Sequence, residues 1–139
     1  MPPDPWGRGN KPPFGGKPYR GKRYKDTERT GITMAKAIHF DAAGFEKALS
    51  RPGVLVADFW AGWCMPCKML APSIDKLAEQ YDGRAVVGKV DIDEEQALAA
   101  RYGVQSIPTV IVFKNGQILA TLVGVRPYDA YTAEIDKAL

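Results

Sequence analysis

Two spacings of apolar residues alternate along the chain. Residues 54–60 and 84–92 are nearly continuous apolar runs, which are typical of strands covered on both faces. Between these runs, apolar residues recur at helical spacing over residues 70–81, beyond Pro66, a residue that the first turn of a helix tolerates. The pattern therefore predicts a strand, a short turn and then a helix.

The same reasoning predicts further elements on both sides of this unit. We expect strands at residues 37–40, 109–113 and 117–123, the last two joined by the hairpin signal Asn115-Gly116. We expect three more helices: one capped by Asp41 and ending near residue 51, one capped by Asp93 over residues 94–102, and one from Pro127 with Tyr128, Tyr131, Ile135 and Leu139 on one face. Strands that alternate with helices, together with one hairpin, predict an α/β domain over residues 36–139, with a central mixed β-sheet and helices on both faces.

The first 35 residues differ in composition from the rest. They hold six prolines and six glycines, and eight Lys or Arg against three Asp or Glu, a net charge of +5. Residues 36–139 carry eleven against thirteen, a net charge of −2. Since residues 1–35 show no apolar run and no periodic pattern, they cannot bury enough surface to offset their ordering entropy, and we expect a disordered basic tail.

The chain also lacks apolar segments of the kind that direct export or membrane insertion. No secretory signal is visible, because its apolar central region is missing, and no stretch approaches the length of a membrane span. We therefore expect a protein of the reducing cytoplasm with no membrane association.

Cys64 and Cys67, the only cysteines, stand in the motif Trp63-Cys64-Met65-Pro66-Cys67. A disulfide across so short a loop would stabilise the fold little, since chain-entropy stabilisation grows with loop length. A structural zinc site needs about four ligands, and the two thiols with the single His39 supply three, short of four without a carboxylate, so we expect no metal site.

A pair of thiols that cycles between dithiol and disulfide remains. Cys64, near a helix N-terminus, would have a lowered pKa and act as the nucleophile. Cys67, one turn further along, would be more buried and would be the resolving cysteine.

Asp58 is an acidic residue inside an apolar strand. Such a carboxylate is costly unless it is paired or its pKa rises. Two interpretations stay open: a strand-edge or water-satisfied carboxylate, or a raised-pKa acid that exchanges a proton with Cys67. Lys89 is a candidate partner, although a surface lysine would explain it as well. We interpret His39, far from the thiols in sequence, as a structural or surface residue.

Several motifs in residues 36–139 resemble those of thioredoxins in order and spacing. They are Asp58-Phe59-Trp60-Ala61, Trp63-Cys64-x-Pro66-Cys67-Lys68, Val90-Asp91-Ile92-Asp93, Ser106-Ile107-Pro108-Thr109, Phe113-Lys114-Asn115-Gly116 and Val123-Gly124. The resemblance implies a thioredoxin-like fold and a protein-disulfide reductase without a bound cofactor. It also implies disulfide-bearing protein substrates and a thioredoxin reductase as electron donor. We expect a monomer.

The resemblance also implies roles for residues around the thiols. Pro108 would follow a cis peptide bond, and the backbone beside it would hold a substrate chain extended. Trp63, Ile107 and Gly124 would form a shallow apolar surface around the exposed sulfur, with Pro66 part of the same surface. Trp60 would pack beneath the site, and Asp58 would be the buried acid with Lys89 beside it.

Met65 departs from the family pattern, in which glycine is usual at this position. Since the residues between the cysteines set the relative stability of dithiol and disulfide, Met65 is expected to change the reduction potential. It also places a soft apolar side chain beside the nucleophile, on the substrate-facing surface.

Two alternative functions are compatible with the sequence. One is an oxidase or isomerase of an oxidising compartment. The other is a binding or assembly subunit whose tail, with Trp6, Phe14, Tyr19 and Tyr24 interleaved among Lys and Arg, binds nucleic acid. An inert solubilising tail is the simpler interpretation of residues 1–35.

Overall fold

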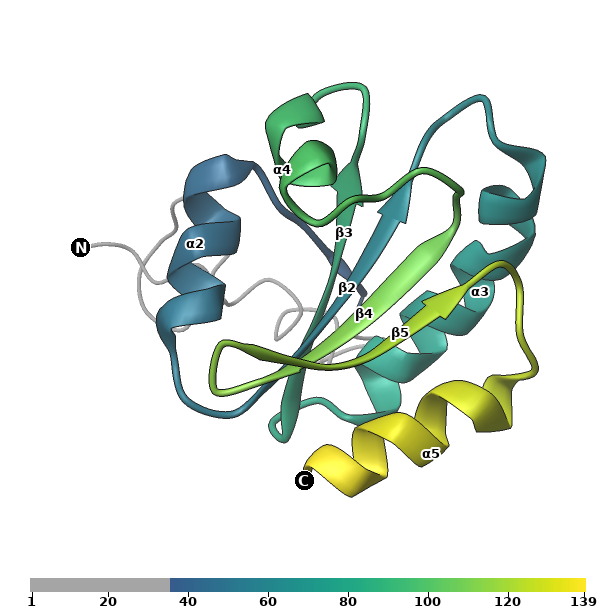
Figure 1. The fold of residues 1–139 in the computed structure, drawn as a ribbon. Helices are drawn as coiled ribbons and strands as arrows, with labels where there is room; N and C mark the ends of the chain where they lie inside the picture. Colours follow the sequence, from purple (N-terminus) through teal and green to yellow (C-terminus); the bar gives the residue numbers. More distant parts are fainter. Residues whose placement is uncertain (1–35) are drawn as a thin grey trace, which may run out of the picture. The chain divides into compact units, whose positions relative to one another are not determined.

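Five strands form one mixed β-sheet in the order β1-β3-β2-β4-β5 (Figure 1). In the computed structural model, which describes residues 36–139, these are β1 (Ile38–His39), β2 (Val54–Trp60), β3 (Ala85–Asp91), β4 (Thr109–Lys114) and β5 (Gln117–Val123). Strands β1, β3 and β2 run parallel, whereas β4 is antiparallel to β2 and to β5. The predicted disordered tail, residues 1–35, lies outside the described residues.

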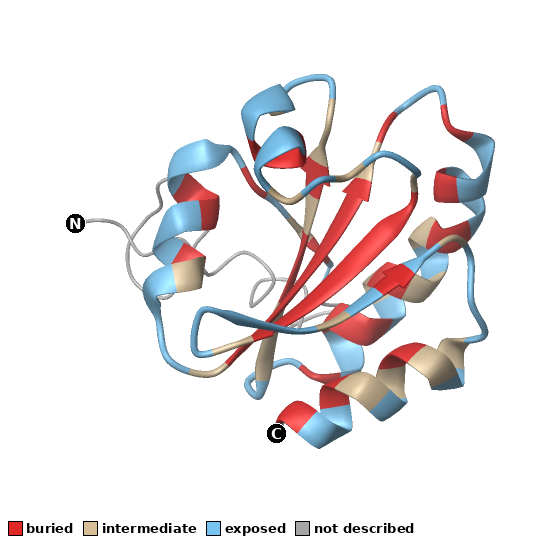
Figure 2. Ribbon diagram, in the orientation of Figure 1, coloured by how far each residue is buried: buried red, intermediate tan, exposed pale blue. Residues whose placement is uncertain are grey.

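Four helices cover the two faces of this sheet. Helices α2 (Ala42–Ser50) and α4 (Gln96–Arg101) lie on one face, and α3 (Met65–Gln80) and α5 (Tyr128–Ala138) lie on the other (Figure 1). The predicted mixed α/β sheet with helices on both faces is therefore confirmed. The central strands are buried along nearly their whole length (Figure 2), which explains their continuous apolar sequence.

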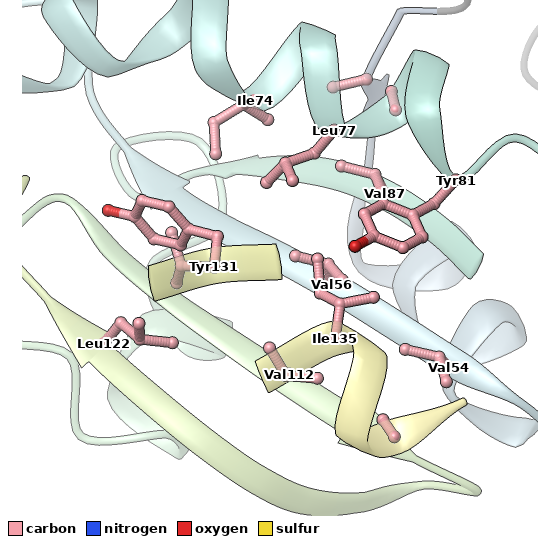
Figure 3. Close-up of a cluster of buried hydrophobic side chains, with 14 of the residues drawn as sticks. Val54, Val56, Ile74, Leu77, Tyr81, Val87, Val112, Leu122, Tyr131 and Ile135 are labelled. Atoms are coloured by element: carbon pink, nitrogen blue, oxygen red, sulfur yellow. The ribbon is translucent and has the colours of Figure 1, made fainter. Parts of the chain in front are cut away.

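The larger part of the core lies between the sheet and helices α3 and α5. Alternate residues of the strands point to this side, among them Val54, Val56, Val87, Val112 and Leu122 (Figure 3). They meet side chains from the buried stripes of the two helices, namely Ile74, Leu77, Tyr81, Tyr131 and Ile135 (Figure 3). Asp58 belongs to the same set of alternate positions on β2, so its carboxylate is directed into this apolar layer.

The opposite face of the sheet is packed with aromatic rings. Phe45 of α2 lies edge-on to Phe40, Tyr102 and Phe113, with ring centroids 5.8 to 5.9 Å apart. Edge-to-face pairs of this kind stabilise by about 0.5–1.5 kcal/mol beyond their buried area. This cluster fixes α2 and the segment after α4 against the sheet.

Short sequence signals explain where α2 begins and how β4 turns into β5. The Asp41 carboxylate accepts a hydrogen bond from the backbone N–H of Gly44 at 2.7 Å, as expected for the cap of α2. Asn115 and Gly116 both have positive φ angles, 51° and 83°, as a two-residue hairpin with the twist of the strands requires.

Two local predictions were wrong. Asp93 does not cap a helix over residues 94–102: α4 is shorter, its N-cap is Glu95 without a side-chain bond, and the Asp93 carboxylate is bonded to Trp63 instead. Leu139 does not share the buried face of α5. It is exposed, and Ala138 is buried in its place beside Tyr131 and Ile135, because the last residue lies beyond the end of the helix.

A glycine on β3 leaves room for the ring of Phe40, the residue after β1. A Cβ atom built on Gly88 would lie 2.2 Å from the ring of Phe40, which is itself buried. Gly88→Ala should therefore lower the free energy of unfolding by about 1–3 kcal/mol through overpacking, measured by urea denaturation. The matched control is Gly62→Ala, where a Cβ would meet nothing within 4 Å. Equal stabilities of the two variants would contradict this account of the packing.

Candidate functional site

Four segments that are far apart in the sequence meet at one end of the sheet. This end receives the carboxyl ends of β2 and β3 and, since β4 is antiparallel to β2, the start of β4 and the end of β5. The segment after β2 holds the cysteines, and the backbone N–H of Ile92 after β3 bonds to the Trp60 carbonyl at 2.9 Å. The carboxyl ends of parallel strands are where ligands commonly bind in open α/β sheets.

Cys64 and Cys67 form a disulfide, with their Cα atoms 5.3 Å apart. Cys64 is the N-cap residue of α3, and its Sγ accepts a hydrogen bond from the backbone N–H of Cys67 at 3.2 Å. Pro66 lies in the first turn, as predicted. An N-terminal N–H directed at Sγ, together with the helix dipole, favours negative charge on the Cys64 sulfur.

Cys67 is more buried than Cys64, as predicted, but the difference between the two whole residues is small. Cys64 is 4% exposed and Cys67 is 2% exposed. Cys64 is covered because Ala61, Trp60, Ile92 and Ile107 pack around the pair. The distinction between the two sulfurs therefore rests on their positions at the helix terminus and not on bulk exposure.

The loop before β4 borders the cysteine pair. The Ile107–Pro108 peptide bond is cis, as the resemblance implied, and the carbonyl oxygen of Ile107 lies 3.8 Å from Cys64 Sγ. Gly124, at the end of β5, donates its backbone N–H to the Pro108 carbonyl at 2.8 Å. Ile107 thus lies beside the sulfur of Cys64, and Gly124 is hydrogen-bonded to the same loop through Pro108.

Trp63 and Met65 flank Cys64 in sequence, and both side chains are exposed. Trp63 is 68% exposed, and its Nε1 donates a hydrogen bond to the Asp93 carboxylate at 2.9 Å. Met65 is 63% exposed, and Pro66 beside it is also exposed. Asp93 was missed as a site residue because its sequence context also fits a helix cap.

Asp58 is fully buried, and neither of its carboxylate oxygens has a hydrogen-bond partner among residues 36–139. Burial raises the pKa of Asp58 to about 7 from its ordinary 3.8, and the nearby Lys89 charge opposes that rise. The strand-edge interpretation of Asp58 is therefore wrong, since β2 is the central strand of the sheet. A carboxyl group that titrates near neutrality can give or take a proton there.

Lys89 lies opposite Asp58 in the pairing of β2 with β3, and its Nζ lies 4.5 Å from the ring centroid of Trp60. Trp60 is half-buried and packs against the cysteine cluster. His39 is closer to this group than its place in the sequence suggested: its ring is edge-on to Trp60 at 6.0 Å, and it pairs with Lys89 across β1 and β3. Burial and the Lys89 charge lower the pKa of His39.

Residues 36–139 contain neither a candidate metal-binding cluster nor a helix that could span a membrane. No group of three or more His, Cys, Asp or Glu side chains in this part of the chain is arranged to hold a metal ion. Within the same residues, no helix is both long enough and apolar enough to cross a bilayer.

Comparison with known proteins gives concordant matches. The thioredoxin family model matches residues 36–137. A thioredoxin of Haemophilus influenzae is 43% identical over 95 residues, 68% of this chain and 89% of that protein. A thioredoxin of Staphylococcus aureus is 49% identical over 87 residues, 63% of this chain and 84% of that protein. Among solved structures, a mutant thioredoxin from Halobacterium salinarum superposes with a TM-score of 0.69 and 37% identity, covering 77% of this chain and 94% of that one.

The burial of Asp58 should make the free energy of unfolding depend on pH. Because its pKa is higher in the folded state than in the unfolded chain, ionising Asp58 destabilises the fold. This cost is absent below about pH 3.8, grows as the pH rises, and is complete above about pH 7. Asp58→Asn should therefore stabilise the protein more at pH 8 than at pH 5, by a difference on the order of 2 kcal/mol.

Urea denaturation of the disulfide form of both proteins at the two pH values measures this difference. Since the other titrating groups are shared, the comparison isolates Asp58. A variant that is less stable than the native protein at pH 8, or a gain that does not depend on pH, would contradict the assignment.

Proposed function

The chain belongs to the thioredoxin family and is a thiol-disulfide oxidoreductase, and we propose that it works as a reductase of protein disulfides through Cys64 and Cys67. The observation that carries this proposal is the position of Cys64 Sγ at the N-cap of α3, bonded to the N–H of Cys67. A sulfur at that position is stabilised as the thiolate, which is the form that attacks a disulfide.

The proposed reaction begins with the reduced protein. The Cys64 thiolate attacks one sulfur of a substrate disulfide, the substrate S–S bond breaks, and the released substrate thiolate takes up a proton. Cys67, as its thiolate, then attacks Cys64 Sγ in the mixed disulfide. This forms the Cys64–Cys67 disulfide and releases the second substrate sulfur as a thiolate, which takes up a proton. Two electrons have passed from the protein to the substrate.

Asp58 is proposed to assist the second step. Cys67 is the third residue of α3, and its thiol must lose its proton before the sulfur attacks. A carboxyl group with a pKa near 7 can accept that proton at neutral pH. Lys89 is proposed to set the charge state of Asp58, since its positive charge favours the carboxylate. Trp60 is proposed to hold the Lys89 ammonium group against its ring.

The substrate chain is proposed to bind across the residues around Cys64. The backbone beside Ile107 and Pro108 would pair with an extended substrate segment, and Gly124 leaves room for it because it carries no side chain. Trp63, Met65 and Pro66 would contact the residues that flank the substrate disulfide. The proximity of Ile107 to Cys64 Sγ supports this arrangement.

The finer assignments of partner and compartment are also proposals. A protein of this family needs a reductase that returns two electrons to the Cys64–Cys67 disulfide, and we propose that a thioredoxin reductase does so. We also propose that the protein acts in the cytoplasm as a monomer and needs no bound cofactor. We propose that residues 36–139 form the catalytic domain. Nucleic-acid binding falls on residues 1–35, outside the described residues, and stays a prediction.

Substitution of each cysteine by serine tests the two roles. Cys64→Ser should abolish turnover with insulin as the disulfide substrate, because the attacking sulfur is lost. Cys67→Ser should instead accumulate a mixed disulfide, because attack continues while resolution fails. Mass spectrometry of the intact protein after incubation with insulin distinguishes these outcomes.

The control for both variants is the native protein in the same assay. If Cys64→Ser keeps turnover, or if only Cys64→Ser traps the substrate, the proposed order of the two cysteines is wrong.

A further inference from the structure

The three most exposed large apolar side chains of residues 36–139 lie within seven residues of each other. They are Trp63 at 68%, Met65 at 63% and Met69 at 68% exposure. All three lie around Cys64, at the start of α3 or just before it. Large exposed apolar groups that gather at one place commonly mark a binding surface.

Met65 and Met69 are one helical turn apart on α3. Residues at this spacing lie on the same face of a helix, and this face is not the one that buries Cys67, Leu70 and Ile74 in the core. Side chains of a helix tilt toward its N-terminus. Met69 therefore leans over the turn that holds Met65, toward the end of the helix at which Cys64 lies.

The side chains on the two sides of Cys64 differ in how they are held. Trp63 is held by the hydrogen bond from its Nε1 to Asp93. The two methionines carry unbranched side chains with several rotatable bonds and polarizable sulfurs, and they can adjust to the shape of a bound group. One side therefore offers a fixed aromatic ring, and the other offers two adaptable thioethers.

We propose that Met65 and Met69 form a thioether platform that selects disulfides whose cysteines are flanked by aromatic residues. The inference rests on the proposed reductase function and names the class of substrate that the same site prefers. Cys64 is only 4% exposed, so a substrate sulfur that bonds to it brings its neighbouring residues against the surfaces beside Cys64. On the α3 side that surface is the methionine pair.

The group that binds to the platform is an aromatic side chain of the substrate, next to the substrate cysteine. Met65 directly follows Cys64, and Met69 is one turn further, so the platform is continuous with the site of sulfur exchange. A flanking aromatic ring can bury against both thioethers while the mixed disulfide forms. Contacts between methionine sulfur and an aromatic ring are more favourable than contacts with an equally large saturated group. This predicts a preference for aromatic rings beyond a preference for apolar size.

Single-turnover kinetics with model peptides test the platform. Three peptides carry the same residue on both sides of one cysteine, either phenylalanine, cyclohexylalanine or serine, and each is used as its symmetric disulfide. The reduced full-length protein is mixed with each peptide, and the second-order rate of disulfide transfer is measured. We expect phenylalanine to react about threefold faster than cyclohexylalanine, the size of an S–aromatic contact, and cyclohexylalanine to react faster than serine.

The double variant Met65→Leu, Met69→Leu separates sulfur chemistry from apolar area. It keeps two large apolar side chains, so the preference for cyclohexylalanine over serine should remain, while the ratio of phenylalanine to cyclohexylalanine should fall to about one. The matched control is Ile118→Ala, which removes an exposed apolar side chain, 53% exposed, near the opposite end of β5 from Gly124. Its ratios should equal those of the native protein.

These ratios do not depend on the reduction potential, because a change in the stability of the Cys64–Cys67 disulfide alters all three rates alike. Equal native rates for phenylalanine and cyclohexylalanine, or an unchanged ratio in the double leucine variant, would overturn the platform while leaving the reductase function intact. A native protein that reacts with every peptide no faster than Cys64→Ser would instead contradict the proposed function, and the platform with it.

Discussion

The sulfur of Cys64 takes the place of a capping side chain at the start of α3. A Ser or Asp at an N-cap accepts a hydrogen bond from the first turn, and here Sγ accepts it from the N–H of Cys67. The helix that supplies this N–H is anchored by the core stripe from Leu70 to Leu77. The reactivity of the sulfur is therefore tied to the packing of α3 on the sheet, and the rest of the site is arranged around that end of the helix.

A second constraint is a carboxyl group inside the apolar layer. Asp58 lies on the central strand, fully buried, with no hydrogen-bond partner among the described residues, and its pKa rises to about 7. Such a position lowers stability at neutral pH. The proposed deprotonation of Cys67 would give a functional reason for keeping an acid at this position. Lys89 lies opposite Asp58 on the neighbouring strand β3, and its Nζ lies over the ring of Trp60.

Much of this arrangement could be predicted from the sequence, because apolar runs, helical spacing and the Asn115-Gly116 turn each report local structure. The positions of Cys64 and Pro66 at the start of α3, and the cis bond before Pro108, were expected from a compact set of motifs. Other features depend on tertiary packing. Asp93 bonds to Trp63 instead of capping α4, the ring of His39 on β1 contacts Trp60 on β2 across β3, and Cys64 is buried together with Cys67. Met69 belongs to none of the sequence motifs. Its exposure beside Met65 depends on which face of α3 is buried, and the sequence pattern did not identify Met69 as part of the site.

The most direct measurement of the central claim is the alkylation rate of each cysteine in the reduced full-length protein at neutral pH. Iodoacetamide is added in small excess, and the modified cysteine is identified by mass spectrometry of peptides over time. If the N-terminus of α3 stabilises the Cys64 thiolate, Cys64 is modified first and at least about tenfold faster than Cys67. Modification of Cys67 at an equal or greater rate would contradict the assignment of Cys64 as the nucleophile.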